Sequence, residues 1–304
     1  MGQEALIVEG TEIRVHGRLV RMACIEGDKY EFVDGPELLI EGLRNCGHRI
    51  DLFTFMQRIP ETEPRYRYPM EWDNLAAVPI STFDNWWTRQ VDAKTRNMVR
   101  KAQKKGVQVR EVPFDDTFVQ GTARIYNETP IRQGRRFRHY GKTADEVRSE
   151  EGTFRDSSVF LGAFLEGTMI GFAKLVSDST GTQAGLMNIL SMVEHRDKAP
   201  TNALVAEAIR SCATRRIPYL VYSNFAYGKK QRDSLSDFKR NNGFERIDLP
   251  RYYVPLTPLG RMALRLRLHH KWIDRLPEPI VTRARELRNL WHARRLQASP
   301  EASQ

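Results

Sequence analysis

Four arginines lie within one short polar segment, residues 129–140, which has the sequence TPIRQGRRFRHY. A guanidinium group offers planar pairs of N–H donors, which match the oxygens of a phosphate or a carboxylate. The segment could therefore hold an anionic substrate through Arg132, Arg135, Arg136 and Arg138. The alternative is a basic loop whose charges are only solvated.

A predicted helix upstream of this segment carries basic residues in two rows. Arg96, Arg100 and Lys104 recur at every fourth position, so they share one face of the helix. Lys101 and Lys105 form a second row beside them. On charge alone, this face either binds an anion or is a solvated helix surface.

Signatures of covalent catalysis and of metal binding are missing from the sequence. The chain shows no Ser–His–Asp or Cys–His arrangement and no CxxC or HxxxH spacing, so we predict neither a covalent intermediate nor a metal site. The three cysteines, Cys24, Cys46 and Cys212, are odd in number and widely spaced, which argues against a disulfide framework. We expect them to be buried, inert thiols.

The chain as a whole has the composition of a globular protein with a basic surface. Its 304 residues are 40% hydrophobic, which is enough to bury a core. A net charge of +10 favours anionic partners such as phosphates, nucleotides, RNA or an anionic membrane. No apolar run approaches the roughly 18 residues of a membrane span, and the sequence MGQEALIVEGTEIRV does not resemble a signal peptide. We expect a cytoplasmic location, with a peripheral position at the inner face of the membrane as an option.

We predict three regions along the chain: a small N-terminal α+β module (1–80), a larger core (81–256) and a basic helical tail (257–304). The tail is amphipathic and far richer in arginine than in acidic residues. Such a tail can lie on an anionic membrane, bind the phosphates of an RNA such as tRNA, or pack on its own domain.

The core is organised around the stretch Val159–Phe244. Its residues predict a strand hairpin with the turn GluGlyThr, followed by a buried strand over 185–192. A helix over 202–214, a further strand and a short helix that stops at Gly243 come next.

This order of elements resembles the core of the GNAT acyltransferase superfamily, and two upstream motifs resemble its FemABX-like branch. The helix motif R-x-x-x-R-K-A-x-K-x-G-V is matched over Arg96–Val107. A second motif, T-x-x-R-x-G-x-x-F, lines the acceptor side in that family. Its matching positions here are Thr129, Arg132, Gly134, Phe137 and Tyr140.

The resemblance implies an α/β (α+β) fold of GNAT type, in which a mixed sheet is flanked by helices, with the small N-terminal module before it and basic C-terminal helices after it. In that fold the central strand splays from its neighbour, and its backbone groups pair with the pantetheine or peptide-like arm of the acyl donor. The donor-binding residues that this implies are Ile189, Leu190, Ser191 and Met192. The acceptor-binding residues are Thr129, Arg132, Arg135, Phe137 and Tyr140.

The loop that precedes the helix departs from the acetyl-CoA pattern. In acetyl-CoA enzymes the motif Q/R-x-x-G-x-G/A lets backbone N–H groups approach the pyrophosphate, whereas the segment HRDKAPTNAL contains no glycine. Arg196 and Lys198 could supply charge instead, and Thr201 or Asn202 could cap the helix. FemABX-like proteins also lack the glycines and take the acyl group from aminoacyl-tRNA.

The helix tyrosine that serves GNAT enzymes as general acid is also replaced, by Phe238 or Lys239. Tyr227 or Tyr222 would then have to substitute for it. The Phe–Lys pair resembles a FemABX-like element in which Lys239 would stabilise negative charge on the acyl carbonyl; the alternative is a surface lysine. Asn224 ends a strand at a position that the family uses to hydrogen-bond the donor. The implied catalytic residues are Lys239, Asn224 and Tyr227.

The resemblance therefore implies an N-acyltransferase or aminoacyltransferase, in which an amine attacks a thioester or ester directly. Acyl-CoA or aminoacyl-tRNA would be the donor co-substrate, and we expect no tightly bound cofactor. The alternative is a catalytically degenerate module of the same fold that binds RNA or anionic lipid through its basic surface. The sequence assigns neither a general base nor an oligomeric state.

Overall fold

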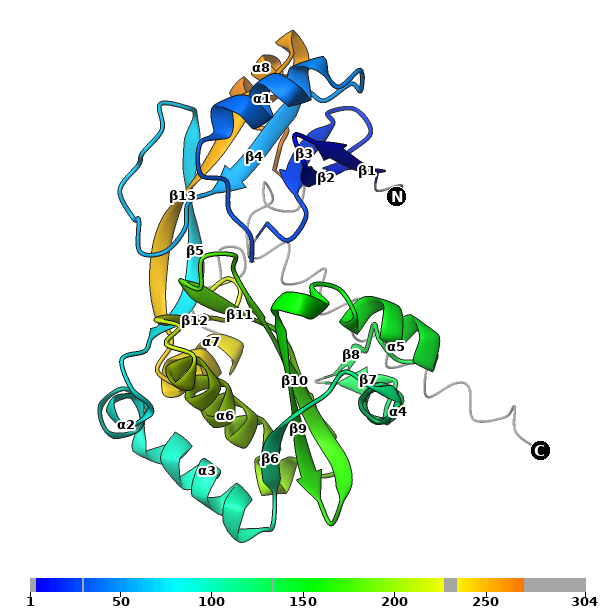
Figure 1. Ribbon diagram of the computed structural model, residues 1–304, viewed down its shortest axis with the longest axis vertical. Coiled ribbons are helices and arrows are strands. Elements are labelled where there is room, and N and C mark those ends of the chain that lie inside the picture. Colours follow the sequence, from blue (N-terminus) through cyan, green and yellow to red (C-terminus); the bar gives the residue numbers. More distant parts are fainter. Residues whose placement is uncertain (1–3, 29, 133, 227–233, 271–304) are drawn as a thin grey trace, which may run out of the picture. The chain divides into compact units, whose positions relative to one another are not determined.

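The computed structural model describes residues 4–28, 30–132, 134–226 and 234–270 of the chain (Figure 1). The chain folds as two compact units. The first comprises Met1–Gln90, Val176–Leu186 and Cys212–Trp272, and the second comprises Val91–Leu175, Met187–Ser211 and Ile273–Gln304. Within the described ranges, no helix is both long enough and apolar enough to cross a bilayer.

The first unit is built on a mostly antiparallel sheet. Its strands, in spatial order, are β1 (Glu4–Val8), β2 (Thr11–His16), β3 (Met22–Ile25), β4 (Leu52–Met56), β13 (Glu245–Pro255), β5 (Met70–Pro79), β12 (Tyr219–Val221) and the start of β11 (Gln183–Ser191). The β3–β4 and β11–β12 pairs are parallel, and the other pairs are antiparallel. Because β13 lies between β4 and β5 (Figure 1), the last third of the sequence completes a sheet that the first third begins.

Helix α1 (Pro36–Asn45) covers part of this sheet. It starts with a proline, which costs no hydrogen bond at the first helical position. Its apolar side, formed by Leu39, Ile40 and Leu43, is buried in one cluster with the aromatic side chains of β4 and β13. Burial of this stripe, rather than intrinsic helix propensity, is what stabilises so short a helix.

Helix α8 (Pro258–Arg265) packs against the residue that precedes β4. Thr257 caps the helix, since its Oγ1 accepts a hydrogen bond from the Gly260 N–H at 3.1 Å and donates one to Asp51 Oδ1 at 2.8 Å. A Cβ atom at Gly260 would lie 1.9 Å from the carbonyl oxygen of Asp51. Only glycine therefore permits this approach of the helix to the sheet.

The remaining helical segments of the first unit are α2 (Phe83–Asn85), the π-helical turn η1 (Trp86–Gln90) and α7 (Ser234–Asn241). The sequence offers two possible caps for α2, Ser81 and Thr82, and Thr82 is the one that caps it, because its Oγ1 accepts from the Asn85 N–H. The fully buried Trp86 donates its indole N–H to the carbonyl oxygen of Asn242 at 3.0 Å. Gly243, with φ of +83°, follows α7 and confirms the predicted glycine stop.

The second unit is a four-stranded sheet with helices on both faces. Its strand order is β11, β10 (Thr168–Ser177), β9 (Ser158–Leu165) and β6 (Gln108–Val112). Helices α3 (Ala93–Lys104) and α6 (Pro200–Thr214) lie on one face, and α4 (Asp116–Tyr126) and α5 (Ala144–Glu151) lie on the other (Figure 1). The short elements are the 3-10 turns η2 (Arg155–Ser157) and η3 (Arg196–Lys198) and the separate hairpin of β7 (Ile131–Arg132) and β8 (Arg135–Arg136).

The predicted hairpin in this unit is confirmed. Strands β9 and β10 are joined by Glu166 and Gly167, which both have positive φ, 50° and 80°. Two-residue connections of this kind match the right-handed twist of the strands.

The predicted start of the helix over 202–214 is wrong by two residues. Helix α6 begins at Pro200, directly after Ala199, whose φ is +54°. Thr201 and Asn202 therefore lie inside the first turn and do not cap the helix as expected. The sterically unusual conformation of Ala199 turns the chain into the helix, and this local strain has no signature in the sequence.

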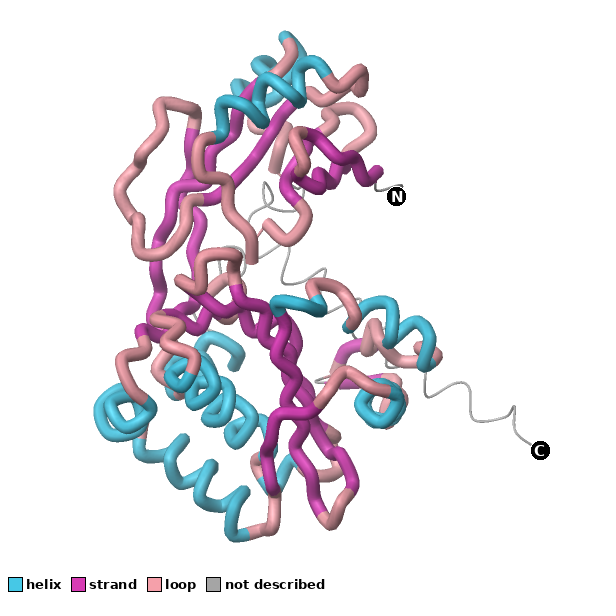
Figure 2. The backbone as a smooth tube through the Cα atoms, viewed as in Figure 1, coloured by secondary structure: helices cyan, strands magenta, loops and turns pink. Residues whose placement is uncertain are grey.

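Strand β5 is the main element that the sequence pattern did not reveal. Its first residues, Glu71, Trp72, Asp73 and Asn74, are mostly polar, and a long loop precedes it (Figure 2). Pairing with β13 on one side and β12 on the other makes this segment a strand. Sheet pairing overrides a weak local pattern in such a case.

Two sequence predictions fall outside the described residues. One concerns Tyr227, a catalytic candidate. The other concerns the basic tail beyond residue 270, of which the structure describes only α8 and the short segment that follows it.

Candidate functional site

Strand β11 is paired with β12 over only its first three residues. The parallel pairing runs from Gln183 opposite Tyr219 to Gly185 opposite Val221, whereas β11 continues to Ser191. The outer half of β11 (Met187–Ser191) is half-buried throughout, although it lies within a sheet. Apart from the Ser191 carbonyl oxygen, which accepts a hydrogen bond from Arg132, its backbone groups on that side are therefore the ones that an extended, peptide-like molecule can pair with. Ile189, Leu190 and Ser191, three of the predicted donor-binding residues, belong to this half.

Close packing on the opposite side holds the outer half of β11 in place. Gly171, on the neighbouring strand β10, has no side chain, and a Cβ atom there would lie 3.1 Å from both the Leu190 carbonyl oxygen and Ser191 Cβ. The Met192 N–H donates to the Ile170 carbonyl oxygen at 2.8 Å. Ser191 Oγ also lies 2.8 Å from Thr201 Oγ1, which ties the strand end to the first turn of α6.

The backbone N–H groups directly after β11 are occupied by a side chain of the same chain. The carboxylate of Glu128 accepts from the Val193 N–H and from the Glu194 N–H, both at 2.8 Å. Acetyl-CoA enzymes are expected to use the N–H groups of this loop for the pyrophosphate. Here the Glu128 carboxylate already accepts two N–H groups of this loop.

Arg132 is part of the same arrangement. Its guanidinium donates to Glu128 Oε2 at 2.9 Å, to the Ser191 carbonyl oxygen at 2.7 Å and to the Ile125 carbonyl oxygen at 2.8 Å. Burial lowers the pKa of Arg132 and nearby Arg196 adds to this, against the raising effect of Glu128. The structure thus brings Arg132 to the end of β11, where it holds the strand through its backbone. Anion capture by this side chain stays a prediction.

A group of cations surrounds the turn η3, just before α6. Burial opposes the shift, but Lys198, Lys101 and Lys105 together lower the pKa of Asp197, and the hydrogen bond from Lys198 has the largest lowering effect. The second basic row of α3 therefore lies beside this loop. Arg196 is exposed here, so together with these lysines it forms a positive surface at the N-terminal end of α6.

The β7–β8 hairpin presents the remaining acceptor-side residues. Arg135 and Tyr140 are exposed, and the ring of Phe137 lies 4.8 Å from the Arg132 guanidinium. Thr129 makes a local turn, since its Oγ1 donates to the Ile131 carbonyl oxygen at 3.1 Å. Of the four arginines in this segment, Arg132 is half-buried and the other three are exposed.

Two of the three predicted catalytic residues meet in the first unit. Lys239 is fully buried on α7, and its Nζ donates to the backbone carbonyl oxygen of Asn224. The same Nζ lies 4.7 Å from the centre of the Tyr222 ring, over its face. The surface-lysine alternative is therefore wrong, because the ammonium group is enclosed by the residues that follow β12.

Asn224 is fixed in turn by a half-buried chain of charged residues. Its side-chain amide donates to Asp73 Oδ1 at 2.7 Å, and Asp73 Oδ2 pairs with Arg251 Nε at 3.0 Å. Arg251 also pairs with Asp28 at 2.8 Å. Although burial opposes it, the two carboxylates raise the pKa of Arg251, so this arginine stays charged. The sequence did not reveal this chain, because Asp28, Asp73 and Arg251 come from distant segments.

The sequence also did not predict a second buried polar cluster. Glu151, fully buried at the end of α5, accepts from Tyr126 Oη at 2.7 Å and from the Asn188 side-chain amide at 2.8 and 3.0 Å. Burial raises the pKa of Tyr126, and the Glu151 carboxylate raises it further. Asn188 belongs to the outer half of β11, so this cluster holds the face of the strand. In the sequence, the only sign of this cluster was an acidic residue, Glu151, a few positions before an apolar strand.

Lys174, the charged residue of the apolar strand β10, is hydrogen-bonded beside this cluster. Its Nζ donates to the carbonyl oxygens of Glu151 and Thr153 at 2.8 and 2.5 Å, and to Thr153 Oγ1 at 3.1 Å. Burial lowers the pKa of this ammonium group to about 8. Three acceptors match the three N–H bonds of a charged lysine, so Lys174 ties the end of α5 to the sheet.

The cysteines are free thiols; Cys212 is buried as predicted, whereas Cys24 and Cys46 are half-buried. Burial raises the pKa of Cys212 to about 12 and that of Cys24 to about 11. A thiol that stays protonated is a poor nucleophile, which agrees with the absence of a Cys–His pattern.

A scan of the sequence against protein-family models found no match, and a search of curated proteins found none either. Three solved structures nevertheless resemble the chain over most of its length. One is the C-terminal domain of a protein from Agrobacterium fabrum that is assigned as a lysylphosphatidylglycerol synthetase. It is 14% identical, with a TM-score of 0.56, and the match covers 86% of this chain and 87% of that one.

The second structure is FemX, at 12% identity and a TM-score of 0.56, with 86% of this chain and 90% of that chain covered. The third is L-PGS from Bacillus licheniformis, at 13% identity and a TM-score of 0.56, with 88% of each chain covered. At such identities the likeness shows the fold. The chain has the predicted GNAT-type fold, a mixed sheet flanked by helices.

Proposed function

We propose that this chain transfers an acyl or aminoacyl group to an amine acceptor, by direct attack of the amine on an ester or thioester donor. The amine nitrogen bonds to the carbonyl carbon, and the C–O or C–S bond to the carrier breaks. The proton that the amine loses is balanced by the proton that the leaving group takes up. The task of the chain is to position two substrates and to stabilise charge on the carbonyl oxygen.

The observation that carries the proposal is the outer half of β11. Pairing with β12 ends at Gly185, and the backbone of Met187–Ser191 continues half-buried beyond it. A strand with available N–H and C=O groups binds an extended amide-containing arm by adding it as a further strand. Pantetheine and a peptide-like aminoacyl arm both have this chemistry.

An aminoacyl ester fits the loop after β11 better than coenzyme A does. Glu128 already accepts the Val193 and Glu194 N–H groups, and its negative charge repels a pyrophosphate at the same position. Exposed cations at η3 suit a more extended anion, such as the phosphate backbone of an RNA. One of the structural neighbours is assigned to lysylphosphatidylglycerol synthesis, which supports an aminoacyl group as the transferred unit.

Lys239 is the residue that we assign to charge stabilisation in this reaction. Its ammonium group is buried and lies at the end of β12 against Asn224 and Tyr222. A fixed positive charge away from bulk water acts more strongly on a developing oxyanion than a solvated one. Asn224, locked by Asp73, is the residue that positions it.

The exposed side chains of the β7–β8 hairpin are our candidates for the acceptor. Arg135, Arg136 and Arg138 offer forked donors, and Tyr140 is exposed beside them. These groups favour an amine that also carries a phosphate or a carboxylate.

The test compares donors and then removes one charge. We expect an aminoacylated RNA minihelix to raise the melting temperature of the protein and acetyl-CoA to leave it unchanged. With the bound donor, Lys239→Met should lower kcat by about 10²–10³-fold with little change in KM, while Lys239→Arg retains part of the activity. Lys94→Met, which removes an exposed lysine of α3 outside both basic rows, is the matched control and should be neutral. Full activity of Lys239→Met would remove Lys239 from the mechanism, and transfer from acetyl-CoA alone would reverse the choice of donor.

A catalytically degenerate module of the same fold is the second candidate. The exposed arginines of the β7–β8 hairpin favour it, because they would bind RNA or anionic lipid without any chemistry. This reading predicts salt-sensitive binding of uncharged tRNA or of anionic vesicles, with neither donor consumed. Turnover of either donor excludes it.

A further inference from the structure

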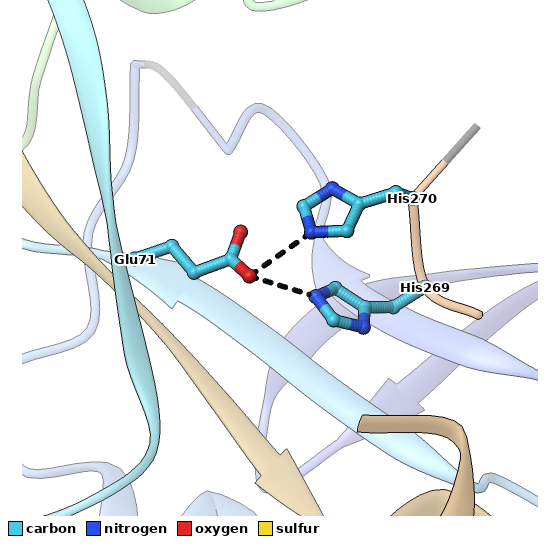
Figure 3. A group of neighbouring side chains, drawn as sticks. All are labelled: Glu71, His269 and His270. Carbon is cyan, nitrogen blue, oxygen red and sulfur yellow. Dashed lines mark hydrogen bonds and ion pairs between the residues drawn. The ribbon is translucent and has the colours of Figure 1, made fainter. Parts of the chain in front are cut away.

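Three ligand-type side chains that have no part in the proposed transfer meet at one point of the first unit. Glu71 lies near the start of β5, and His269 and His270 follow α8. Figure 3 shows both imidazole rings turned toward the same carboxylate oxygen. Glu71 Oε1 is 3.1 Å from His269 Nε2 and 3.0 Å from His270 Nε2, across 198 and 199 positions of sequence.

Packing fixes the orientation of the rings. The His269 side chain is only 3% exposed, and its ring lies 4.7 Å from that of Tyr253, on β13. The ring centres of His269 and His270 are 4.1 Å apart. His270 and Glu71 are 32% and 39% exposed, so one side of the cluster is open to solvent. The group is therefore half-enclosed, with one ring that cannot turn away.

The spacing of the three atoms is close to that of a metal site. All three lie within 4.8 Å of one another. Zn²⁺ binds imidazole nitrogen at about 2.0–2.1 Å and carboxylate oxygen at about 2.0–2.2 Å, so neighbouring ligand atoms in a tetrahedral site are about 3.3–3.5 Å apart. The two N···O separations of 3.1 and 3.0 Å are a few tenths of an ångström shorter. Small side-chain rotations would admit the ion.

The donor set also selects the class of ion. Two imidazole nitrogens and one carboxylate oxygen suit Zn²⁺ and its late first-row neighbours, whereas Mg²⁺ and Ca²⁺ prefer oxygen ligands throughout. Three protein ligands leave a fourth position for water, and the exposed side of Glu71 and His270 provides the access.

We propose that Glu71, His269 and His270 form a binding site for Zn²⁺ or a similar divalent transition metal. The ion would link the segment after α8 to strand β5, and so join two parts of the first unit that are far apart in sequence. The prediction of no metal site rested on local spacing patterns, which detect ligands only when they are close together in the sequence. This proposal is independent of the transfer reaction.

The test uses the full chain, stripped of metal with a chelator and titrated with Zn²⁺. We expect one Zn²⁺ per chain by elemental analysis and a higher melting temperature, since the ion binds only the folded state. His270→Ala removes a partly exposed ligand without opening the core and should weaken binding by at least about 100-fold, beyond the effect of losing an outer-shell partner. Glu71→Gln should weaken it as well. Co²⁺ should give the visible absorption of a tetrahedral site in the unaltered protein, and neither His270→Ala nor Glu71→Gln should show it.

His48→Ala is the matched control. His48 Nδ1 also pairs with a glutamate, Glu4, at 2.9 Å, but the pair is exposed and is not part of a three-ligand cluster within the described residues. This change should leave Zn²⁺ binding and the Co²⁺ spectrum as they are. The proposal is overturned if the stripped protein binds no Zn²⁺, or if His270→Ala and Glu71→Gln bind it as tightly as the unaltered chain.

Discussion

Replacement of Glu128 tests most directly how the loop after β11 is organised. The carboxylate of Glu128 accepts two backbone N–H groups at 2.8 Å and the Arg132 guanidinium at 2.9 Å. The side chains of Glu128 and Arg132 are 15% and 11% exposed, so the pair is largely shielded from water. Glu128→Ala leaves one charge and two N–H donors without their acceptor.

The expected magnitude follows from that geometry. Loss of one partner from a buried ion pair typically costs about 3–5 kcal/mol, because the remaining charge is left uncompensated. We therefore expect Glu128→Ala to lower the free energy of unfolding by about 3–5 kcal/mol. Glu128→Gln keeps one carbonyl acceptor and should cost less. Urea denaturation followed by circular dichroism measures both changes.

Glu61→Ala is the matched control for this measurement. Glu61 also pairs with an arginine four residues later, Arg65, at 3.6 Å, but both side chains are about half exposed. An exposed pair of this kind contributes roughly 0–1 kcal/mol. A cost for Glu128→Ala no larger than that of Glu61→Ala would show that the internal carboxylate does not organise the loop.

The same variant separates the two donor classes. If Glu128 fills the position of a pyrophosphate, inorganic pyrophosphate and coenzyme A should not raise the melting temperature of the unaltered chain. Glu128→Ala exposes the Val193 and Glu194 N–H groups beside Arg132, so coenzyme A should then stabilise the variant. The reasoning is refuted if coenzyme A binds the unaltered chain and Glu128→Ala weakens that binding.

Two further predictions concern the elements that hold the candidate residues. Asp51 is hydrogen-bonded by the Arg21 N–H and by Thr257, and these bonds lower its pKa from 3.8 although burial alone would raise it. Its contribution to stability is therefore fully present above pH 3.8 and is lost as the pH falls through the lower pKa of the folded state. Asp51→Asn should cost about 1–2 kcal/mol at neutral pH, and urea denaturation should show that difference shrinking in acid; a constant difference would contradict the assignment. Gly171→Ala places a methyl group 3.1 Å from Ser191 Cβ, so it should lower the free energy of unfolding by about 1–3 kcal/mol and weaken donor binding, whereas unchanged values of both would show that β10 and β11 are not packed tightly.

Local sequence signals predicted the elements that local energetics decide. The β9–β10 hairpin follows from a turn that needs two positive φ values, which Glu166 and Gly167 supply. Thr82 is a helix cap because its own hydroxyl accepts the Asn85 N–H three residues later. The glycine stop at Gly243 depends on the conformation of one residue. Each of these signals spans only a few positions, so the sequence contains all the information that they need.

The candidate site was predicted less completely, because its environment is made by distant residues. The sequence pointed to Lys239 and Asn224, and the structure brings them together. It could not show that Asp73 holds the Asn224 amide, since Asp73 lies on β5, a strand that exists only through its pairing with β12 and β13. The sequence showed the motif that contains Arg132, but it could not show that the Arg132 side chain binds Glu128 and the end of β11.

The sequence by itself therefore determined the order of the elements in the stretch Val159–Phe244 and the residue types available for chemistry. Hydrophobic periodicity and turn residues are local properties, and they are sufficient for these two conclusions. The fold class came from the resemblance of that order of elements to a known superfamily. Tertiary structure alone decided which polar groups are already occupied. The Val193 N–H in the loop after β11 is bound by Glu128. Glu71 contacts His269 and His270, which lie 198 and 199 positions later in the sequence. Such contacts depend on sheet order and register, which bring together side chains that no spacing along the chain connects.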